Sequence, residues 1–119
     1  MIKGGNITIF VSDVPKAVHF YVSLIGLKLI KRHSKHWATV SAGGGLTIGL
    51  HEQSPNHPAP GTNGAVLFGL HVPGSLAAEV QRLTEHGVNV ERTGVDDVGK
   101  FAYLHDADGN AFYLWSTQR

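Results

Sequence analysis

The alternation of apolar and polar residues predicts a strand followed by a helix at the start of the chain. Residues 7–11 (ITIFV) are rich in β-branched side chains, which is typical of a strand. Asp13 is a typical helix N-cap, and Pro15 is favourable in a first turn because its missing N–H loses no hydrogen bond there. Apolar residues then recur with helical spacing as far as Ile25, and Gly26 can adopt the left-handed conformation that ends a helix.

Short strands, one further helix and a proline-rich linker are predicted in the rest of the chain. A turn at Ser34 and Lys35 is expected to join the next two strands, and Ser75 and Gly87 are expected to bound the second helix. Residues 53–63 (QSPNHPAPGTN) contain three prolines and predict a linker. The predicted elements are strands at residues 27–33, 36–41, 46–52 and 65–72, a helix at 76–86, and strands at 88–93, 100–105 and 111–116.

The two halves of the chain resemble each other, which indicates an internal repeat. Gly26 aligns with Gly87, 61 residues later, and residues 37–40 (WATV) align with residues 101–104 (FAYL), 64 residues later. Either half alone is too small to bury both its helix and one face of a sheet.

The repeat predicts an α+β fold built from two tandem βαβββ modules. The first module is expected at residues 1–52 and the second at residues 64–119, within a single domain of residues 1–119. The modules are expected to form a curved mixed sheet with the helices outside and a cavity inside.

Composition narrows the class of protein and of partner. The 119 residues carry a formal net charge of +1, which gives no basis for a nucleic-acid or membrane-surface partner. No apolar segment approaches the length of a transmembrane helix, and a cytoplasmic location is expected. The absence of cysteine excludes disulfides, thiolate catalysis and cysteine-ligated metals. Eight histidines are an unusual number for this length and mark candidate chemistry.

Two stretches resemble a known superfamily. Residues 11–14 (VSDV), followed by Phe20-Tyr21 and Gly26-Leu27, and the turn and apolar strand at residues 106–114 (DADGNAFYL) resemble the vicinal oxygen chelate superfamily. Its members include glyoxalase I, extradiol dioxygenases and bleomycin-resistance-type binding proteins. The resemblance covers nearly the whole chain. It implies the βαβββ repeat and, because short members form pairs, a homodimer.

Since Asp106 and Asp108 lack the spacing of a calcium loop, we interpret them as turn residues.

The resemblance also implies where a metal ion would bind. Metal-using members draw His, Glu or Gln ligands from four strands, and the corresponding positions here are Asn6, Gly49, Leu67 and Tyr113. None of these is a standard ligand, and a divalent ion needs three or four converging donors. The usual metal site is therefore expected to be absent, and no cofactor is predicted. A shifted divalent metal site at His51 and His71 is the alternative.

Strand alternation predicts which side chains face the cavity. Residues with the parity of the four ligand positions are expected to point inward. Small Gly49 and Gly69 are expected to leave space there. The other histidines (His19, His33, His36, His57, His86 and His105) are expected to be exposed structural residues. The predicted ligand-binding residues are Asn6, Thr8, Phe10, Trp37, His51, His71, Tyr103, Tyr113 and Trp115.

Aromatic walls with a few polar groups suit a planar organic ligand. The leading function is therefore metal-independent binding of a small aromatic or drug-like molecule in a sheet-lined cleft, resembling antibiotic-resistance binding proteins. A close bleomycin-type match is disfavoured, because a slightly basic chain does not suit a cationic glycopeptide. One alternative is a glyoxalase- or dioxygenase-type metal enzyme with a shifted site. Another is a metal-free isomerase or cyclase in which His51 or His71 is the general base.

Overall fold

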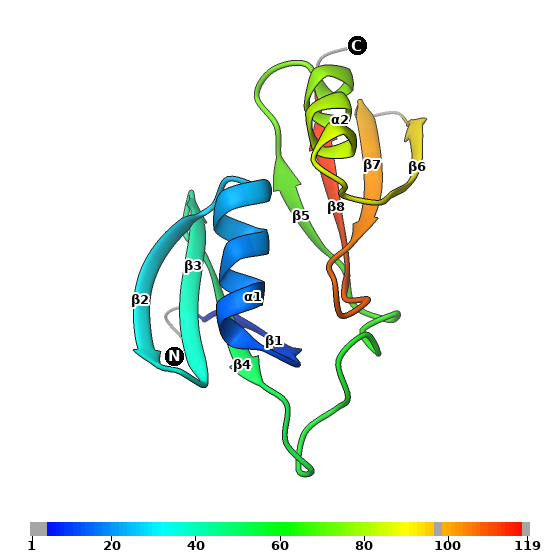
Figure 1. Cartoon of the computed structure of the whole chain (residues 1–119). Coiled ribbons are helices and arrows are strands. Elements are labelled where there is room, and N and C mark those ends of the chain that lie inside the picture. Colours follow the sequence, from blue (N-terminus) through cyan, green and yellow to red (C-terminus); the bar gives the residue numbers. More distant parts are fainter. Residues whose placement is uncertain (1–4, 97–98, 118–119) are drawn as a thin grey trace. The chain divides into compact units, whose positions relative to one another are not determined.

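The computed structural model describes residues 5–96 and 99–117, and it confirms the predicted α+β fold (Figure 1). The order strand, helix, three strands occurs twice along the chain. Contacts divide the chain into two compact units, Met1–Thr62 and Asn63–Arg119. Each unit has its own four-stranded mixed sheet and its own helix. In the described part of the chain no helix is long and apolar enough to cross a membrane.

The first unit has the strand order β1-β4-β3-β2. β1 is parallel to β4, and the other neighbouring strands are antiparallel. The turn between β2 and β3 lies one residue later than predicted, because Ser34 pairs with Trp37 and its Oγ accepts a hydrogen bond from the N–H of His36 (3.1 Å). The elements are β1 (Ile7–Val11), α1 (Val14–Val18), η1 (His19–Leu24), β2 (Lys28–Ser34), β3 (Trp37–Gly43) and β4 (Leu46–Glu52).

The first helix begins as predicted and then widens. The Asp13 carboxylate accepts a hydrogen bond from the N–H of Lys16 (3.0 Å), which caps α1. From His19 the chain continues as a π-helix, the segment η1. In this segment two consecutive aromatic residues, Phe20 and Tyr21, are both buried. Gly26, with φ of 98°, then ends the helix.

The second unit repeats this arrangement with the strand order β5-β8-β7-β6. β5 begins at Phe68, three residues later than predicted. The Asn63 side chain explains this: its amide accepts from the N–H of Ala111 and donates to the carbonyl of Ala111, both at 2.9 Å. The Asn63 side chain therefore takes the backbone groups with which a longer β5 would pair. The elements are β5 (Phe68–His71), α2 (Leu76–Glu85), β6 (Val90–Val95), β7 (Lys100–His105) and β8 (Ala111–Ser116).

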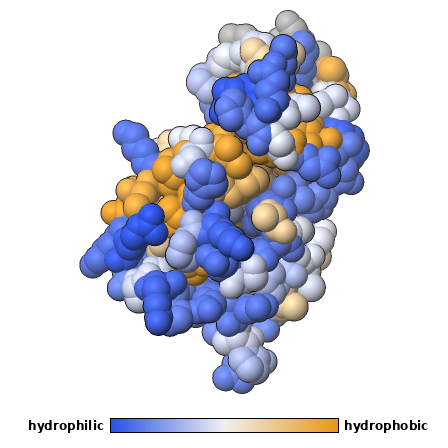
Figure 2. Space-filling model, viewed as in Figure 1, coloured by the Kyte–Doolittle hydropathy of each residue, from blue (hydrophilic) through white to orange (hydrophobic). Residues whose placement is uncertain are grey.

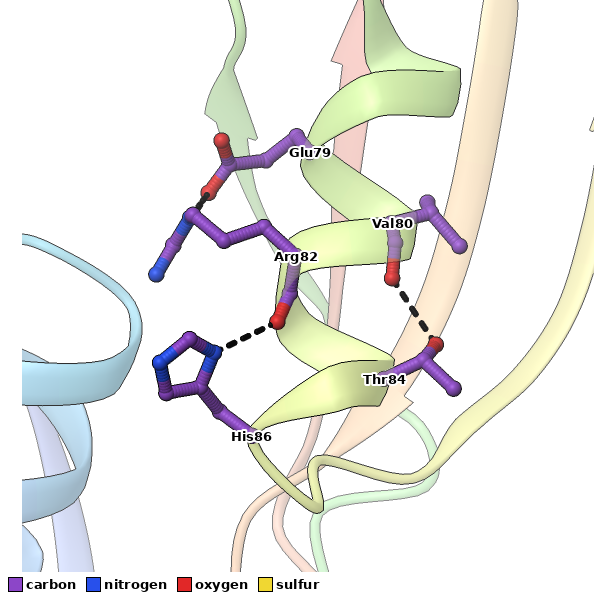
Figure 3. A network of polar contacts seen from close by, with 5 residues as sticks. All are labelled: Glu79, Val80, Arg82, Thr84 and His86. Carbon is purple, nitrogen blue, oxygen red and sulfur yellow. Dashed lines mark hydrogen bonds and ion pairs between the residues drawn. The ribbon is translucent and has the colours of Figure 1, made fainter.

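Helix α2 is bounded by polar contacts at both ends. Ser75 Oγ accepts a hydrogen bond from the N–H of Ala78 (3.1 Å), as expected for an N-cap. At the other end, His86 Nδ1–H donates to the Arg82 carbonyl (2.8 Å), as Figure 3 shows. In the middle, Arg82 forms an ion pair with Glu79. The hydrogen bond to Glu79 raises the pKa of the Arg82 guanidinium, and partial burial offsets some of that increase.

In each unit the core lies between the helix and one face of the sheet. α1 contacts β3 and β4, and α2 contacts β6, β7 and β8. Residues that face the helix are buried, such as Val40 and Leu50 in the first unit and Leu104 and Phe112 in the second. Most side chains that alternate with them are only partly buried and lie on the opposite face, which we call the far face of each sheet. Most of the surface seen in Figure 2 is hydrophilic, and some apolar side chains are exposed in both units.

The repeat extends to an irregularity in the sheet. β2 has a register shift between Leu29 and Lys31, and β6 has one between Val90 and Arg92. Such a bulge inserts one residue and changes which side chains share a face. Lys31 and Arg92 thereby pair with Thr39 and Tyr103, respectively, on the far faces of their sheets.

Candidate functional site

The far face of the second sheet carries a cluster of aromatic side chains. Phe101 pairs with Trp115 and Tyr103 pairs with Tyr113 across strands β7 and β8. The ring centres of Phe101 and Tyr103 are 5.2 Å apart, and those of Tyr103 and Tyr113 are 5.8 Å apart. All four side chains are partly buried, so each keeps accessible ring surface. We call these four residues the aromatic row.

A cavity of about 380 Å³ opens beside the aromatic row. This volume falls within the range of small-molecule sites in proteins. Aromatic rings supply the apolar walls, and a few polar groups accompany them. The lining residues are Asp96, Gly99, Lys100, Phe101, Tyr103, Tyr113, Trp115 and Ser116.

Gly69 leaves no empty space, contrary to the expectation from sequence. A Cβ atom at Gly69 would overlap the Tyr113 ring, so that ring already covers the glycine. Phe101 covers Gly94 in the same way. These glycines therefore allow two aromatic rings to lie close against the backbone of neighbouring strands.

Two further residues extend the aromatic row. His71, a predicted site residue, stacks on Trp115 with ring centres 4.3 Å apart. Arg92, which the sequence did not indicate, lies over Tyr103 with its guanidinium carbon 4.2 Å from the ring centre. It lies 5.6 Å from the ring centre of Phe101. In the sequence, Arg92 aligns with Lys31 of the first module, which is a basic residue too. Only the bulge in β6 shows that Arg92 lies on the far face of the sheet.

The far face of the first sheet carries more polar side chains beside its aromatic ones. Around Gly49 the structure brings together three predicted site residues, Asn6, Thr8 and Trp37. A Cβ at Gly49 would lie 3.4 Å from Thr8 Oγ1 and 3.6 Å from Trp37 Nε1, which leaves room for a methyl group. The space at Gly49 therefore admits a methyl group, but three side chains already lie within contact distance of it. His33, expected to be only an exposed structural residue, stacks on Trp37 with ring centres 3.7 Å apart.

At one end of this face, three rings from distant segments meet. Phe10 lies 5.8 Å from His51, measured between ring centres, as their pairing across β1 and β4 requires. His57, in the predicted linker, stacks on Phe10 at 4.5 Å and lies 5.6 Å from His51. Its position could not be anticipated, because the linker has no periodic pattern that would direct a side chain. A hydrogen bond between Ser54 Oγ and His57 Nδ1 (2.6 Å) holds the ring.

The orientation of His51 is set by a backbone group. Its Nδ1 lies 2.8 Å from the carbonyl oxygen of Glu52, which can only accept a hydrogen bond. In the neutral imidazole Nδ1 therefore carries the proton, and Nε2 keeps the lone pair that could accept a proton or a hydrogen bond. His71 belongs to the other unit, and each of these histidines contacts aromatic residues of its own unit.

The remaining histidines form other polar contacts or are exposed. His36 forms an ion pair with Glu52, and His105 Nδ1 lies 3.2 Å from a carboxylate oxygen of Glu91. His86 caps α2, and His19 is exposed.

The donor groups present do not fit a metal ion at the positions used by metal-binding members of the superfamily. Gly49 and Leu67 have no donor side chain, and Leu67 precedes β5. Within residues 5–96 and 99–117, no three His, Cys, Asp or Glu side chains are grouped closely enough to hold a metal ion.

Comparison with known proteins shows where this fold belongs. Residues 5–114 match the family model of the Glyoxalase/Bleomycin resistance protein/Dioxygenase superfamily. A comparison with curated proteins found no match.

Solved structures of the superfamily are similar over nearly the whole chain. TnmS3, described as an antibiotic binding protein from Streptomyces sp. CB03234, is 30% identical with a TM-score of 0.77, over 98% of this chain and 96% of that chain. A glyoxalase/bleomycin resistance protein from the same organism is also 30% identical, with a TM-score of 0.73 over 95% and 99% of the two chains. The fosfomycin resistance protein FosX from Listeria monocytogenes, at 21% identity, shares the fold, with a TM-score of 0.75 over 98% and 94% of the two chains. The chain therefore belongs to the Glyoxalase/Bleomycin resistance protein/Dioxygenase superfamily.

Proposed function

We propose that this protein binds a small planar aromatic or drug-like molecule on the aromatic row, without a metal ion. The observation that carries this proposal is the cavity of about 380 Å³ whose walls include all four rings of that row. The similarity to an antibiotic binding protein at 30% identity supports it. The unsuitable donor groups at the superfamily's metal positions support the metal-independent form of the proposal.

The strength of stacking indicates what else the ligand needs. A flat ligand that loses about 200 Å² of apolar surface gains roughly 5 kcal/mol before the cost of association. Micromolar affinity corresponds to about 8 kcal/mol. Stacking on one face of the ligand is therefore too weak alone, and we expect polar contacts to contribute.

Tryptophan fluorescence provides a direct test, because Trp37 and Trp115 are the only two tryptophans. In a Trp37→Phe variant, Trp115 is the sole reporter and lines the cavity. Titration with phenazine, a neutral planar tricycle, is expected to quench its emission, both before and after treatment with EDTA. Tyr103→Ala should weaken the quenching, and Tyr103→Phe, which keeps the ring, should preserve it.

Two results would contradict the proposal. One is unchanged Trp115 emission at saturating phenazine. The other is binding that EDTA abolishes and a divalent ion restores, which would favour the metal enzyme. Native mass spectrometry of untagged protein from cells, without added metal, would identify a bound organic adduct. It would also test the homodimer that we propose by analogy with short superfamily members.

A second candidate function rests on the orientation of His51. With Nδ1–H held by the Glu52 carbonyl, Nε2 is available as a general base for a metal-free isomerase or cyclase. Loss of turnover in His51→Gln with ligand binding retained would favour catalysis over simple binding. The same test applies to His71→Gln.

A further inference from the structure

We propose that the ligand of the aromatic row is a planar aromatic anion, such as an aromatic carboxylate, and that Arg92 binds its charged group. This inference rests on the proposed function and specifies the class of ligand. It starts from the position of a guanidinium group that is fixed in place but has no anionic partner in the described part of the chain.

Arg92 is held over the aromatic row by its strand and by two rings. The bulge in β6 places it opposite Tyr103, and its guanidinium carbon lies 4.2 Å from that ring centre and 5.6 Å from that of Phe101. A cation above an aromatic face is stabilised by the ring quadrupole. The guanidinium carries its five N–H donors in one fixed plane.

The described residues supply no carboxylate within ion-pair distance of Arg92, although acidic residues are close in sequence. Glu91, the preceding residue, is directed to His105, with 3.2 Å between its carboxylate oxygen and Nδ1. Arg82, by contrast, forms an ion pair with Glu79 on its own helix. Arg92 is solvent-exposed, so its donors are accessible to a ligand.

The charges around the cavity also favour an anion. Lys100 lines the cavity and adds a second positive charge. Asp96 is the carboxylate among the lining residues, and its Oδ1 accepts a hydrogen bond from the N–H of Gly99 (3.0 Å) within the local turn. Among the described residues, Lys100 and Asp96 line the cavity and Arg92 lies beside the row, which gives two positive charges and one carboxylate.

These features match the shape of an aromatic acid. A planar ring system can stack on the aromatic row while a carboxylate, which lies close to the plane of its ring, reaches the edge of the guanidinium. Arginine and carboxylate can then form two parallel hydrogen bonds, which fix the orientation of the ligand. This polar contact supplies the affinity that stacking alone does not provide.

Three anthracene probes of different charge test the inference. Anthracene-2-carboxylate, 2-(hydroxymethyl)anthracene and 2-(aminomethyl)anthracene share the ring system and carry negative, zero and positive charge. Fluorescence anisotropy of the probe measures each Kd directly. We expect the carboxylate to bind about tenfold or more tightly than the alcohol at low salt, as a charge-assisted pair predicts, and the amine to bind weakest. The preference should shrink as salt screens the pair.

Variants then locate the charge. Arg92→Gln should reduce the carboxylate preference to nearly zero and leave the alcohol's Kd within about twofold, whereas Arg92→Lys should keep part of the preference. Arg32→Gln is the matched control, because Arg32 is an exposed arginine on β2 of the first unit. It should leave all three affinities unchanged. Thermal unfolding of each variant verifies that it is folded, which we expect because both positions are exposed.

The outcomes separate this inference from the proposed function. Equal binding of the acid and the alcohol by the unmodified protein would overturn the inference and leave the proposed function standing. The same holds if the acid preference survives Arg92→Gln, or if the amine binds tightest, which would indicate Asp96 as the dominant charge. Absence of binding by all three probes would overturn both.

Discussion

The Tyr113 ring on β8 lies over Gly69 on β5 and takes the space that any larger side chain at position 69 would need. The two residues are register partners in the parallel pair, so this contact is built into the sheet. It explains why a strand next to the aromatic row contains glycine. The glycine therefore supports the position of one ring of the aromatic row.

Gly69→Ala is expected to displace the Tyr113 ring. The overlapping atoms lie at the far end of the tyrosine side chain, so the ring can swing away and the stability change should be within about 1 kcal/mol, partly offset by the better strand propensity of alanine. Probe affinity and the NMR resonances of the ring should change clearly. Gly49→Ala is the control, since its Cβ would make only contacts of 3.4 Å or more. Unchanged Tyr113 resonances in Gly69→Ala would show that the contact does not position the ring.

Asp106 is expected to be essential for the turn between β7 and β8. Its Oδ1 accepts hydrogen bonds from the N–H groups of Asp108 and Asn110, both at 2.9 Å, and its Oδ2 accepts from Asn110 Nδ2 at 3.1 Å. Asp106→Ala leaves these donors without that acceptor and should lower the free energy of unfolding by about 2–4 kcal/mol. Asp106→Asn keeps one oxygen acceptor and should lose less than half as much. Urea denaturation measures both, and equal losses would argue against the role of Oδ1.

The tautomer of His51 can be read directly by NMR. The hydrogen bond from Nδ1–H to the Glu52 carbonyl predicts that neutral His51 carries its proton on Nδ1 and has a deprotonated Nε2. ¹⁵N chemical shifts of the imidazole at mildly alkaline pH distinguish the two tautomers. His86 is an internal comparison, because its Nδ1–H also donates to a carbonyl. A His51 ring protonated on Nε2 would remove the structural basis for His51 as the base.

The Glu79–Arg82 pair on α2 is expected to contribute little to the free energy of unfolding. Across the neutral and mildly alkaline range, this contribution should depend on salt concentration rather than on pH. A pair at i,i+3 on a partly exposed helix stabilises by about 0.2–0.5 kcal/mol. The hydrogen bond to Glu79 raises the pKa of Arg82 in the folded protein, so the contribution is present below the unfolded pKa and is lost only in strong alkali.

Comparison of Arg82→Ala with the native protein should therefore give the same difference in stability from about pH 6 to about pH 10. The difference should decline as salt concentration rises. Gln81→Ala is a control on the same helix, because the uncharged Gln81 amide donates a hydrogen bond to the Glu85 carboxylate (3.2 Å), and an interaction with only one charged partner should respond less to salt. A pronounced dependence on pH within that range would contradict the assignment.

Local residue patterns were sufficient for most of the fold. The N-caps Asp13 and Ser75 are confirmed, and Gly26 and Gly87 follow the ends of the helices with positive φ. Caps, turns and periodicity act over a few residues, so the sequence carries them directly. The internal repeat then predicted the fold, because two modules with the same order of elements are expected to pack a helix on a sheet in the same way.

The sequence by itself determined the βαβββ repeat and which strand residues alternate toward the far faces. Only the tertiary structure decided how those residues meet. The bulge in β6 places Arg92 over Tyr103, and the path of the linker places the His57 ring against Phe10. The Asn63 side chain shortened β5 by forming hydrogen bonds with the backbone N–H and carbonyl of Ala111. Each of these contacts joins residues on different segments through a register, a bulge or a side chain that replaces a backbone partner, and no local pattern encodes such a choice.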